Sequence, residues 1–232
     1  MRGVVILFLL AATIPYSPPY ARDPRVHSLG MFGFKGHAHA LLAPIAEKVI
    51  DVLAYESESP RAELHELIQS NGNDKVVDLG CGTGGSTPVN GIGVDSSPSM
   101  LKVARLRAGN LNKTFVLADA ESYGDALQFD AAIISFLLHE VPPMGRENIL
   151  RNALRIAFEV YIIDIARNYT PSPLMLTGEP YLLGFLDDLS SEIGRLSKEE
   201  GLSVSHRRIG KGRVDMYHLS RDAMWDDDRF II

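Results

Sequence analysis

A glycine-rich turn after a short apolar run is the first feature of the sequence that could do chemistry. Gly80, Gly82 and Gly85 follow the apolar run 76–79, and Asp95 lies fifteen positions after Gly80. Glycines at such a turn let backbone amides approach a ligand closely, because no Cβ intervenes. The spacing formally matches the dinucleotide-binding fingerprint, in which the acidic residue comes about 20 positions later. The turn therefore predicts a nucleotide-like ligand at the end of a strand.

Asp78 separates two classes of cofactor that can use such a turn. It lies two residues before Gly80, still inside the expected strand. An aspartate there would repel the pyrophosphate of a dinucleotide, whereas a cationic ligand would be attracted. A nicotinamide-dependent oxidoreductase is also disfavoured because no Tyr-x-x-x-Lys pair follows downstream. Asp78 therefore favours a cationic cofactor.

Four segments in the same order extend the pattern well beyond the glycine turn. The run Val77–Gly84 resembles motif I of class I S-adenosylmethionine-dependent methyltransferases. The likeness continues through 93–101, 118–121 and 129–134, so that it covers about 60 residues. The motifs are most similar to the ubiquinone/menaquinone-type small-molecule branch of the family. A second, fainter likeness is to algal and bacterial enzymes that methylate sulfur in small thioether acids such as methylthiohydroxybutyrate.

The resemblance implies S-adenosyl-L-methionine as the cofactor and assigns roles around it. The backbone at Gly80 and Gly82, with Asp78, would surround the methionine part. Asp95 would accept hydrogen bonds from both ribose hydroxyls, and Asp119 with its neighbour would read the adenine edge. The cofactor-binding residues that the resemblance implies are Asp78, Gly80, Cys81, Gly82, Gly84, Asp95, Ser96, Asp119, Ala120 and Phe136.

The segment after the fourth expected strand holds the best candidates for acceptor chemistry. In this family the end of that strand meets both cofactor and acceptor, and here it carries His139 and Glu140. A hydroxyl or nitrogen acceptor needs a base, which contributes about 10²–10⁴-fold. His139 is the candidate base, and Glu140 would orient it or bind an acceptor cation. A thioether acceptor loses no proton and needs only alignment for in-line displacement. The candidate acceptor contacts are His37, Asp164 and Tyr181.

Two glycine-containing segments are expected to close over the acceptor. They are 32–39, before the first helix, and 174–181, after the fifth strand. His37 and His39 lie two apart, but no third ligand pairs with them in sequence, so no metal is expected. The competing hypothesis is a non-catalytic cofactor-binding module, which would keep the glycine turn and Asp95 but lack an open acceptor pocket.

Apolar periodicity places these residues in an α/β fold. We expect a doubly wound, mostly parallel, seven-stranded Rossmann-like sheet with an antiparallel edge strand and helices on both faces. Only 17 positions separate Asp78 from Asp95, so the first crossover has room for at most a turn or so of helix. The expected strands are 76–79, 92–95, 114–117, 129–138, 160–165, 202–209 and 213–219. The expected helices are 36–54, 60–68, 98–108, 149–157 and 181–196.

Length and charge narrow the class of acceptor. The chain has 232 residues, which suits one domain without a separate substrate domain. Its net charge is −6, from 23 Lys and Arg against 29 Asp and Glu, which disfavours a nucleic-acid substrate. The single cysteine, Cys81, excludes an internal disulfide. We therefore expect a small-molecule acceptor, and the oligomeric state stays open.

The first residues have the pattern of a targeting segment. A positive start at Arg2 precedes an apolar run that ends at Ile14. This run is too short to span a bilayer but suits a signal-type leader. We expect residues 1–22 to be a targeting or anchoring leader, 23–220 the domain with a helical lid at 23–70, and 221–232 a tail. The leader predicts delivery to an organelle or association with a membrane without firm insertion beyond it; a cytoplasmic location is the alternative.

Overall fold

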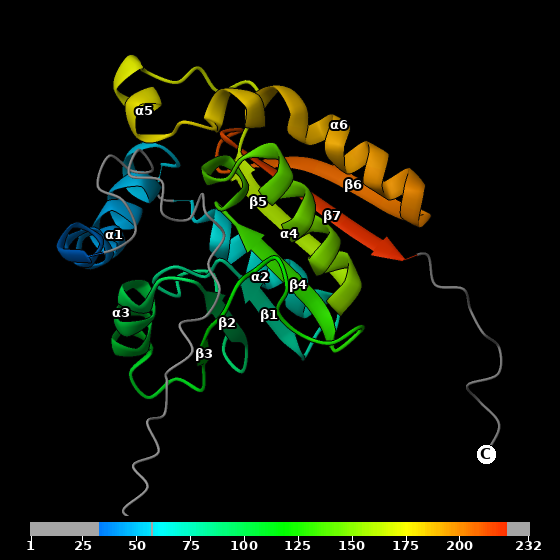
Figure 1. Cartoon of the computed structure of the whole chain (residues 1–232), viewed down its shortest axis with the longest axis horizontal. Coiled ribbons are helices and arrows are strands. Elements are labelled where there is room, and N and C mark those ends of the chain that lie inside the picture. The colour runs from blue at the N-terminus through cyan, green and yellow to red at the C-terminus, as the bar shows by residue number, and fades with distance from the viewer. Residues whose placement is uncertain (1–32, 57, 222–232) are drawn as a thin grey trace, which may run out of the picture.

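The central element of the fold is a seven-stranded sheet of order β3-β2-β1-β4-β5-β7-β6 (Figure 1). The computed structural model describes residues 33–56 and 58–221. All pairings are parallel except those of β7 with β5 and with β6, so the final hairpin forms one edge of the sheet. The strands are β1 (Val76–Leu79), β2 (Ile92–Asp95), β3 (Thr114–Leu117), β4 (Phe129–Ser135), β5 (Ala157–Ile165), β6 (Leu202–Ile209) and β7 (Val214–Arg221). The predicted fold class is confirmed, and β7 is the strand that runs against the others.

Helices cover both faces of this sheet. One core cluster joins α4 and α6 to β1, β4 and β5, and another joins α2 to the opposite face. The helices are α1 (Gly33–Leu53), α2 (Pro60–Ser70), α3 (Pro98–Ala108), α4 (Pro143–Ile156), α5 (Pro173–Gly178) and α6 (Leu182–Glu200), with a short 3-10 turn η3 (Leu138–Glu140). Within the described ranges, none of these helices combines the length and apolarity needed to cross a bilayer. The expected leader and tail lie outside the described residues, apart from Arg221.

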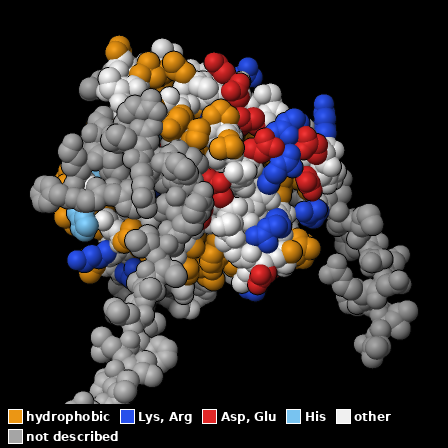
Figure 2. All heavy atoms as spheres, viewed as in Figure 1, with side chains coloured by type: hydrophobic (Ala, Val, Ile, Leu, Met, Phe, Trp, Pro, Cys, Tyr) orange, Lys and Arg blue, Asp and Glu red, His pale blue; other side chains and the backbone are white. Residues whose placement is uncertain are grey.

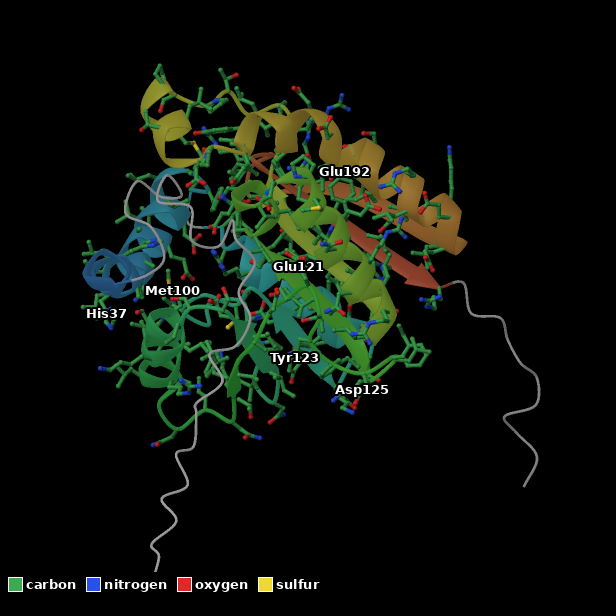
Figure 3. All side chains as sticks on the ribbon, viewed as in Figure 1. His37, Met100, Glu121, Tyr123, Asp125 and Glu192 are labelled. Carbon is green, nitrogen blue, oxygen red and sulfur yellow. The ribbon has the colours of Figure 1, made fainter. Side chains whose placement is uncertain are left out.

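The first crossover contains no helix, which agrees with a spacing that left room for at most a turn or so. Residues 80–91 connect β1 to β2 as turns, although the two strands pair in parallel. The N-terminal helix α1 lies beside α3 instead, where Ala40 packs against Met100 and Val103 (Figure 1). His37 Nδ1 lies 3.3 Å from Ser99 Oγ, and His37 and Met100 mark this contact between the two helices (Figure 3). The helix α1, which precedes the glycine turn in the chain, therefore packs against α3, which follows it.

The fourth strand ends earlier than its apolar run predicts. The strand stops at Ser135, because Phe136 adopts a left-handed backbone with φ +52°. The Phe136 amide still donates to the Ile163 carbonyl at 2.8 Å, after which the chain turns into η3. Predicted strand residues 136–138 therefore belong to a turn over the carboxyl end of the sheet. The helix α5 was not predicted, and α4 begins at Pro143, six residues before its predicted start.

A buried ion pair fixes α4 against α6. Arg146 is fully buried, and its guanidinium donates from Nε and Nη2 to the two oxygens of Glu192, at 3.0 and 2.9 Å. Its Nη1 donates to the carbonyl of Val141 at 3.3 Å. Because Val141 directly follows η3, this arginine ties the turn after β4 to both helices.

Candidate active site

The glycine turn adopts a backbone conformation that favours glycine, with positive φ at Gly80, Gly82 and Gly84. Gly80 has φ +72°, and a Cβ added there would lie 2.5 Å from Leu137 Cδ2. The Gly80 and Cys81 amides donate to the Val94 carbonyl at 2.8 and 2.9 Å, which fixes the turn against β2. The sequence Gly80-Cys81-Gly82 therefore forms a cradle of backbone at the end of β1.

Asp95, the last residue of β2, is hydrogen-bonded to that cradle. One carboxylate oxygen accepts from the Gly82 amide at 2.8 Å, and the other accepts from the Ser97 amide at 2.7 Å. The Ser97 hydroxyl in turn accepts from Met100 and caps α3. Burial raises the pKa of Asp95 to about 6, against the lowering effect of those two amide donors. A carboxylate in this place can accept further hydrogen bonds from a ligand in the cavity.

Asp78 lies on the side of the glycine turn away from the cavity and stabilises the residues that follow the turn. It is fully buried in β1, and one oxygen accepts hydrogen bonds from Ser86 at 2.9 Å and from Thr87 at 2.6 Å. Burial raises the pKa of this carboxyl, which the two hydroxyls partly offset. Its side chain therefore holds the helix-free crossover in place and does not line the cavity described below.

His139 and Asp164 form a buried pair at the ends of β4 and β5. The His139 Nδ1 lies 2.6 Å from Asp164 Oδ1, and the other carboxylate oxygen accepts from the Leu138 and His139 amides at 3.0 and 3.4 Å. Phe185 of α6 meets the imidazole edge-on at 6.0 Å. Asp164 thus fixes both the ring and the backbone of η3.

The electrostatics of this pair make the imidazole a cation at neutral pH. Burial alone would lower the pKa of His139, but the Asp164 charge and hydrogen bond, with Glu140 and Glu179 nearby, raise it to about 9. The Nδ1–H donates to Asp164, which leaves Nε2 for the cavity that His139 lines. The protonated ring donates hydrogen bonds, and only its small neutral fraction, which grows as the pH approaches 9, could remove a proton.

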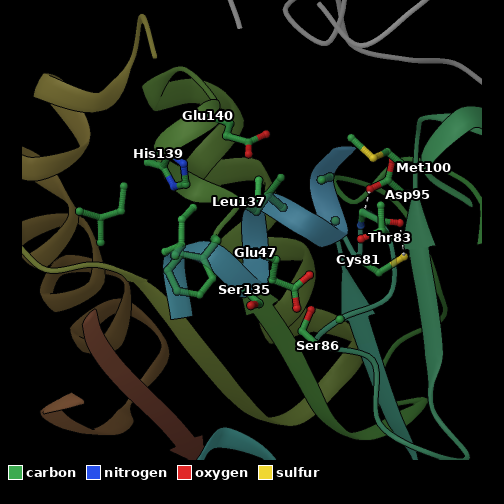
Figure 4. Close-up of a pocket in the computed structure, with 18 of the residues that line it drawn as sticks. Glu47, Cys81, Thr83, Ser86, Asp95, Met100, Ser135, Leu137, His139 and Glu140 are labelled. Atoms are coloured by element: carbon green, nitrogen blue, oxygen red, sulfur yellow. Dashed lines mark hydrogen bonds between the residues drawn. The ribbon is translucent and has the colours of Figure 1, made fainter. Parts of the chain in front are cut away.

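A cavity of about 580 Å³ lies along the carboxyl ends of the strands and joins these groups (Figure 4). Its size is in the usual range for a small-molecule site. Asp95 and His139 stand on opposite sides of it in the close-up, with Ser135 between them on the floor. The predicted residues that line the cavity are Gly80, Cys81, Gly82, Asp95, Ser96, Asp119, Ala120, Phe136, His139 and Glu140.

Five predicted site residues lie away from the cavity wall. Asp78 is behind the turn, Gly84 packs against Phe115 and Ala104, and Asp164 stands behind His139. His37 faces α3, and Tyr181 precedes α6. Direct contact of these five residues with ligands stays a prediction, and for Asp78 and Asp164 the structure gives a positioning role.

The N-terminal helices supply one wall of the cavity, and the sequence motifs did not identify the residues that form it. The cavity is lined by Glu47 of α1, by Tyr55 just after α1, and by Arg61 of α2. The Arg61 guanidinium lies 4.6 Å from the centre of the Phe136 ring and 3.8 Å from Glu47. From the other side come Ile165, Tyr169, Met175, Glu179 and Arg213. Both predicted lid segments contribute to the cavity wall, the first through His39 and the second through Met175 and Glu179. Arg61 lies in neither segment, and no local motif marks it as a site residue.

The cavity fits the cofactor that the sequence motifs imply. The positive φ of Gly80 and Gly82 favours glycine, so that bare backbone faces a ligand there, and Asp95 offers carboxylate oxygens beside it. The carboxylates of Asp95 and Asp119 give this half of the cavity the negative charge that suits a sulfonium cation. Across the described part of the chain, no group of three or more His, Cys, Asp or Glu is placed to hold a metal ion.

Comparison with solved structures supports the fold. The methyltransferase domain of bacterial CtHen1 aligns with a TM-score of 0.56 and 16% identity, over 69% of this chain and 96% of that one. Magnesium protoporphyrin IX methyltransferase from Synechocystis PCC 6803, with bound SAH, aligns at 0.52 and 17%, over 86% and 93%. Phosphoethanolamine N-methyltransferase 2 from Haemonchus contortus, in complex with S-adenosyl-L-methionine, aligns at 0.51 and 15%, over 64% and 48%.

Comparison with family models identifies the domain itself. Residues 76–157, which include the glycine turn, Asp95, Asp119 and His139, match the family described as a methyltransferase domain. No curated protein matches the chain. The branch within the family stays a prediction. Residues 76–157 thus form the core of an S-adenosylmethionine-dependent methyltransferase domain, with its cofactor motifs at the carboxyl edge of the sheet.

Proposed function

We propose that the chain transfers the methyl group of S-adenosylmethionine to a small-molecule acceptor, chiefly by aligning the two. The observation that supports a small acceptor is the single continuous cavity of about 580 Å³, which holds the cofactor motifs and His139 together. The cofactor supplies a methyl group activated by its sulfonium charge. The residues of this chain orient the acceptor, because α1, α2 and η3 all contribute to the cavity wall.

A thioether acid is the acceptor class that we propose, with Arg61 and Arg213 as its cationic contacts in a wall that also carries Glu47, Glu140 and Glu179. His139 is protonated at neutral pH, so it suits an acceptor that loses no proton. Arg61 and Arg213 add cations to the cavity wall that can bind a carboxylate. Ile50, Phe136 and Met175 supply apolar surface for the rest of a small acid. A hydroxyl acceptor would instead require a neutral base at this position.

The cavity also argues against a non-catalytic cofactor-binding module. It extends past the cofactor motifs to His139, Tyr169 and Arg213, on elements that the cofactor motifs do not include. A module that only bound the cofactor would have no need of this second part.

An acceptor panel tests the proposal directly. The chain is incubated with methyl-labelled S-adenosylmethionine and, in separate reactions, with thioether acids, phenols, amines, total RNA and unfolded protein. Label is expected in the small-molecule reactions, with thioether acids the best acceptors. Label in RNA or protein, with none in any small molecule, would contradict the proposal.

Cofactor affinity is expected to depend on the ionisation of Asp95. A carboxylate accepting from ribose hydroxyls contributes roughly 1.5–3 kcal/mol, so Asp95→Ala should weaken binding about tenfold or more. In the wild type, affinity should fall as the pH drops through about 6, because protonation removes the acceptor charge. Calorimetry from pH 5 to 8 measures this, with Asp95→Asn as the control: it cannot ionise, so its weaker binding should not change over that range. Identical pH dependence in both proteins would refute the role of Asp95.

We propose further that residues 1–22 direct the chain to an organelle or to a membrane, because a positive start at Arg2 precedes an apolar run that ends at Ile14. Removal of residues 1–14 should leave a chain that folds and binds cofactor, since the described core begins with α1 at Gly33. Circular dichroism and calorimetry on the shortened chain measure this. Loss of folding would show that the apolar run belongs to the core.

A further inference from the structure

The outer face of α1 is an apolar surface without a partner among the described residues. Seven aliphatic side chains on this helix are between 48% and 76% exposed, and all of them except Ile50 share one face. Contiguous exposed apolar surface of this kind marks a contact site. The members of this α1 stripe are Leu41, Leu42, Ile45, Val49, Val52 and Leu53.

Helical geometry separates the α1 stripe from the two faces of α1 that are in use. At 3.6 residues per turn the six side chains fall within an arc of about 120°. The face on one side of this arc carries Ala40, which packs against α3. The face on the other side carries Ala43, Ala46 and Ile50, which line the cavity. The stripe is therefore a third face, pointing away from both contacts.

Basic side chains flank the stripe on its α3 side. Lys48 of α1 is exposed and lies on that side by the same geometry. In α3, Lys102 is exposed as well, whereas Arg107 pairs with Glu47 of α1 at 3.2 Å and Arg105 donates to the Phe115 carbonyl at 2.8 Å. Figure 2 shows basic atoms over α3 beside hydrophobic atoms near α1. The surface thus combines apolar and positive character.

The chain outside the described residues enters the molecule at this helix. The described chain begins at Gly33, the first residue of α1, and the 32 residues before it include the apolar run that ends at Ile14. We propose that the α1 stripe lies against a lipid surface with anionic headgroups, beside the point where the leader meets the domain. An amphipathic helix of this kind buries its apolar face at the headgroup boundary, while flanking cations bind the anionic lipids.

A lipid surface suits this face better than a second copy of the chain. The stripe is one convex helix ridge of 13 residues, about 20 Å long. A ridge can sink among headgroups without a matching groove, whereas two copies meeting stripe to stripe would bring their flanking cations together. Because the opposite face of α1 lines the cavity, lipid contact would also place the mouth of the active site near the bilayer.

Flotation of the full chain with lipid vesicles tests this proposal. Vesicles of phosphatidylcholine alone are compared with vesicles that also contain phosphatidylglycerol. The stripe variant is Leu41→Gln with Ile45→Gln and Val49→Gln. The matched control is Phe158→Gln with Leu183→Gln and Val204→Gln, three exposed hydrophobic residues outside α1. Cofactor binding by calorimetry confirms that both variants are folded.

Wild type and control are expected to float with the anionic vesicles, and less so in high salt. The stripe variant should partition at least about tenfold more weakly. Equal flotation of stripe variant and wild type would overturn the proposal, since the leader alone would then account for binding. A wild type that does not float but forms a dimer, dissociated by the stripe substitutions, would overturn it in favour of self-association.

Discussion

Replacing Arg146 by alanine is expected to lower the free energy of unfolding by about 3–5 kcal/mol. The guanidinium is fully buried and makes a two-pronged contact with Glu192, at 3.0 and 2.9 Å. Its removal leaves the Glu192 carboxylate facing a cavity and frees the Val141 carbonyl from its donor. Equilibrium urea denaturation followed by circular dichroism measures the loss.

Two control variants separate burial from charge pairing. Arg151 lies on α4 like Arg146, but on the surface, where it pairs with Glu147 of α4 and Glu199 of α6. Arg151→Ala should therefore lower the free energy of unfolding far less. The double variant Arg146→Met with Glu192→Leu should be more stable than Arg146→Ala, because no buried charge is left alone. Equal losses for Arg146→Ala and Arg151→Ala would contradict the structural role of the buried pair.

Replacing Asp164 by alanine is expected to reduce turnover by about 10²-fold, through misplacement of His139 and η3. The carboxylate accepts from the Leu138 and His139 amides and holds the imidazole at 2.6 Å. Asp164→Asn is the matched control, because it keeps an acceptor for the amides but loses the charge. It should retain more activity than Asp164→Ala and should lower the pKa of His139 toward its ordinary value.

The sign of the pH effect on stability follows from the same pair. The folded state raises the pKa of His139 from 6.5 to about 9. The pairing therefore stabilises the fold fully below pH 6.5, and this contribution is lost as the pH rises through about 9. NMR titration of the His139 ring gives its pKa, and denaturation from pH 6 to 9.5 gives the stability. A ring that titrates near 6.5 in the wild type would contradict this pairing.

Local signals in the sequence were sufficient for the elements around the cofactor. The bounds of β1, β2 and β3 agree with prediction because each short apolar run is flanked by glycine or polar residues. The start of α3 was readable from Ser97 as cap and Pro98 at the first helical position, which the structure confirms. These features depend on residues close together in the chain, so their physics is visible without the fold.

Other parts of the site depend on contacts between distant residues. His139 and Asp164 are 25 positions apart and meet because β4 and β5 are neighbours. The sequence alone did not show this pairing, and Asp164 was predicted as an acceptor contact instead. The helix α1 is apolar on more than one face, and its pattern could not say which face lines the cavity. The early end of β4 depends on the left-handed backbone of Phe136, in a run whose apolar residues favour a strand.

The central claim is methyl transfer by alignment, with His139 as a cation and not as a base. Its most direct test is the single-turnover rate of methyl transfer to the best acceptor found in the panel, from pH 6 to 8, in wild type and His139→Gln. The account predicts a wild-type rate that does not change with pH over this range, since an imidazole with a pKa of about 9 is mostly protonated up to pH 8. The variant should be slower by a constant factor. A wild-type rate that climbs about tenfold per pH unit, with the climb absent from His139→Gln, would show that His139 removes a proton and would contradict the account.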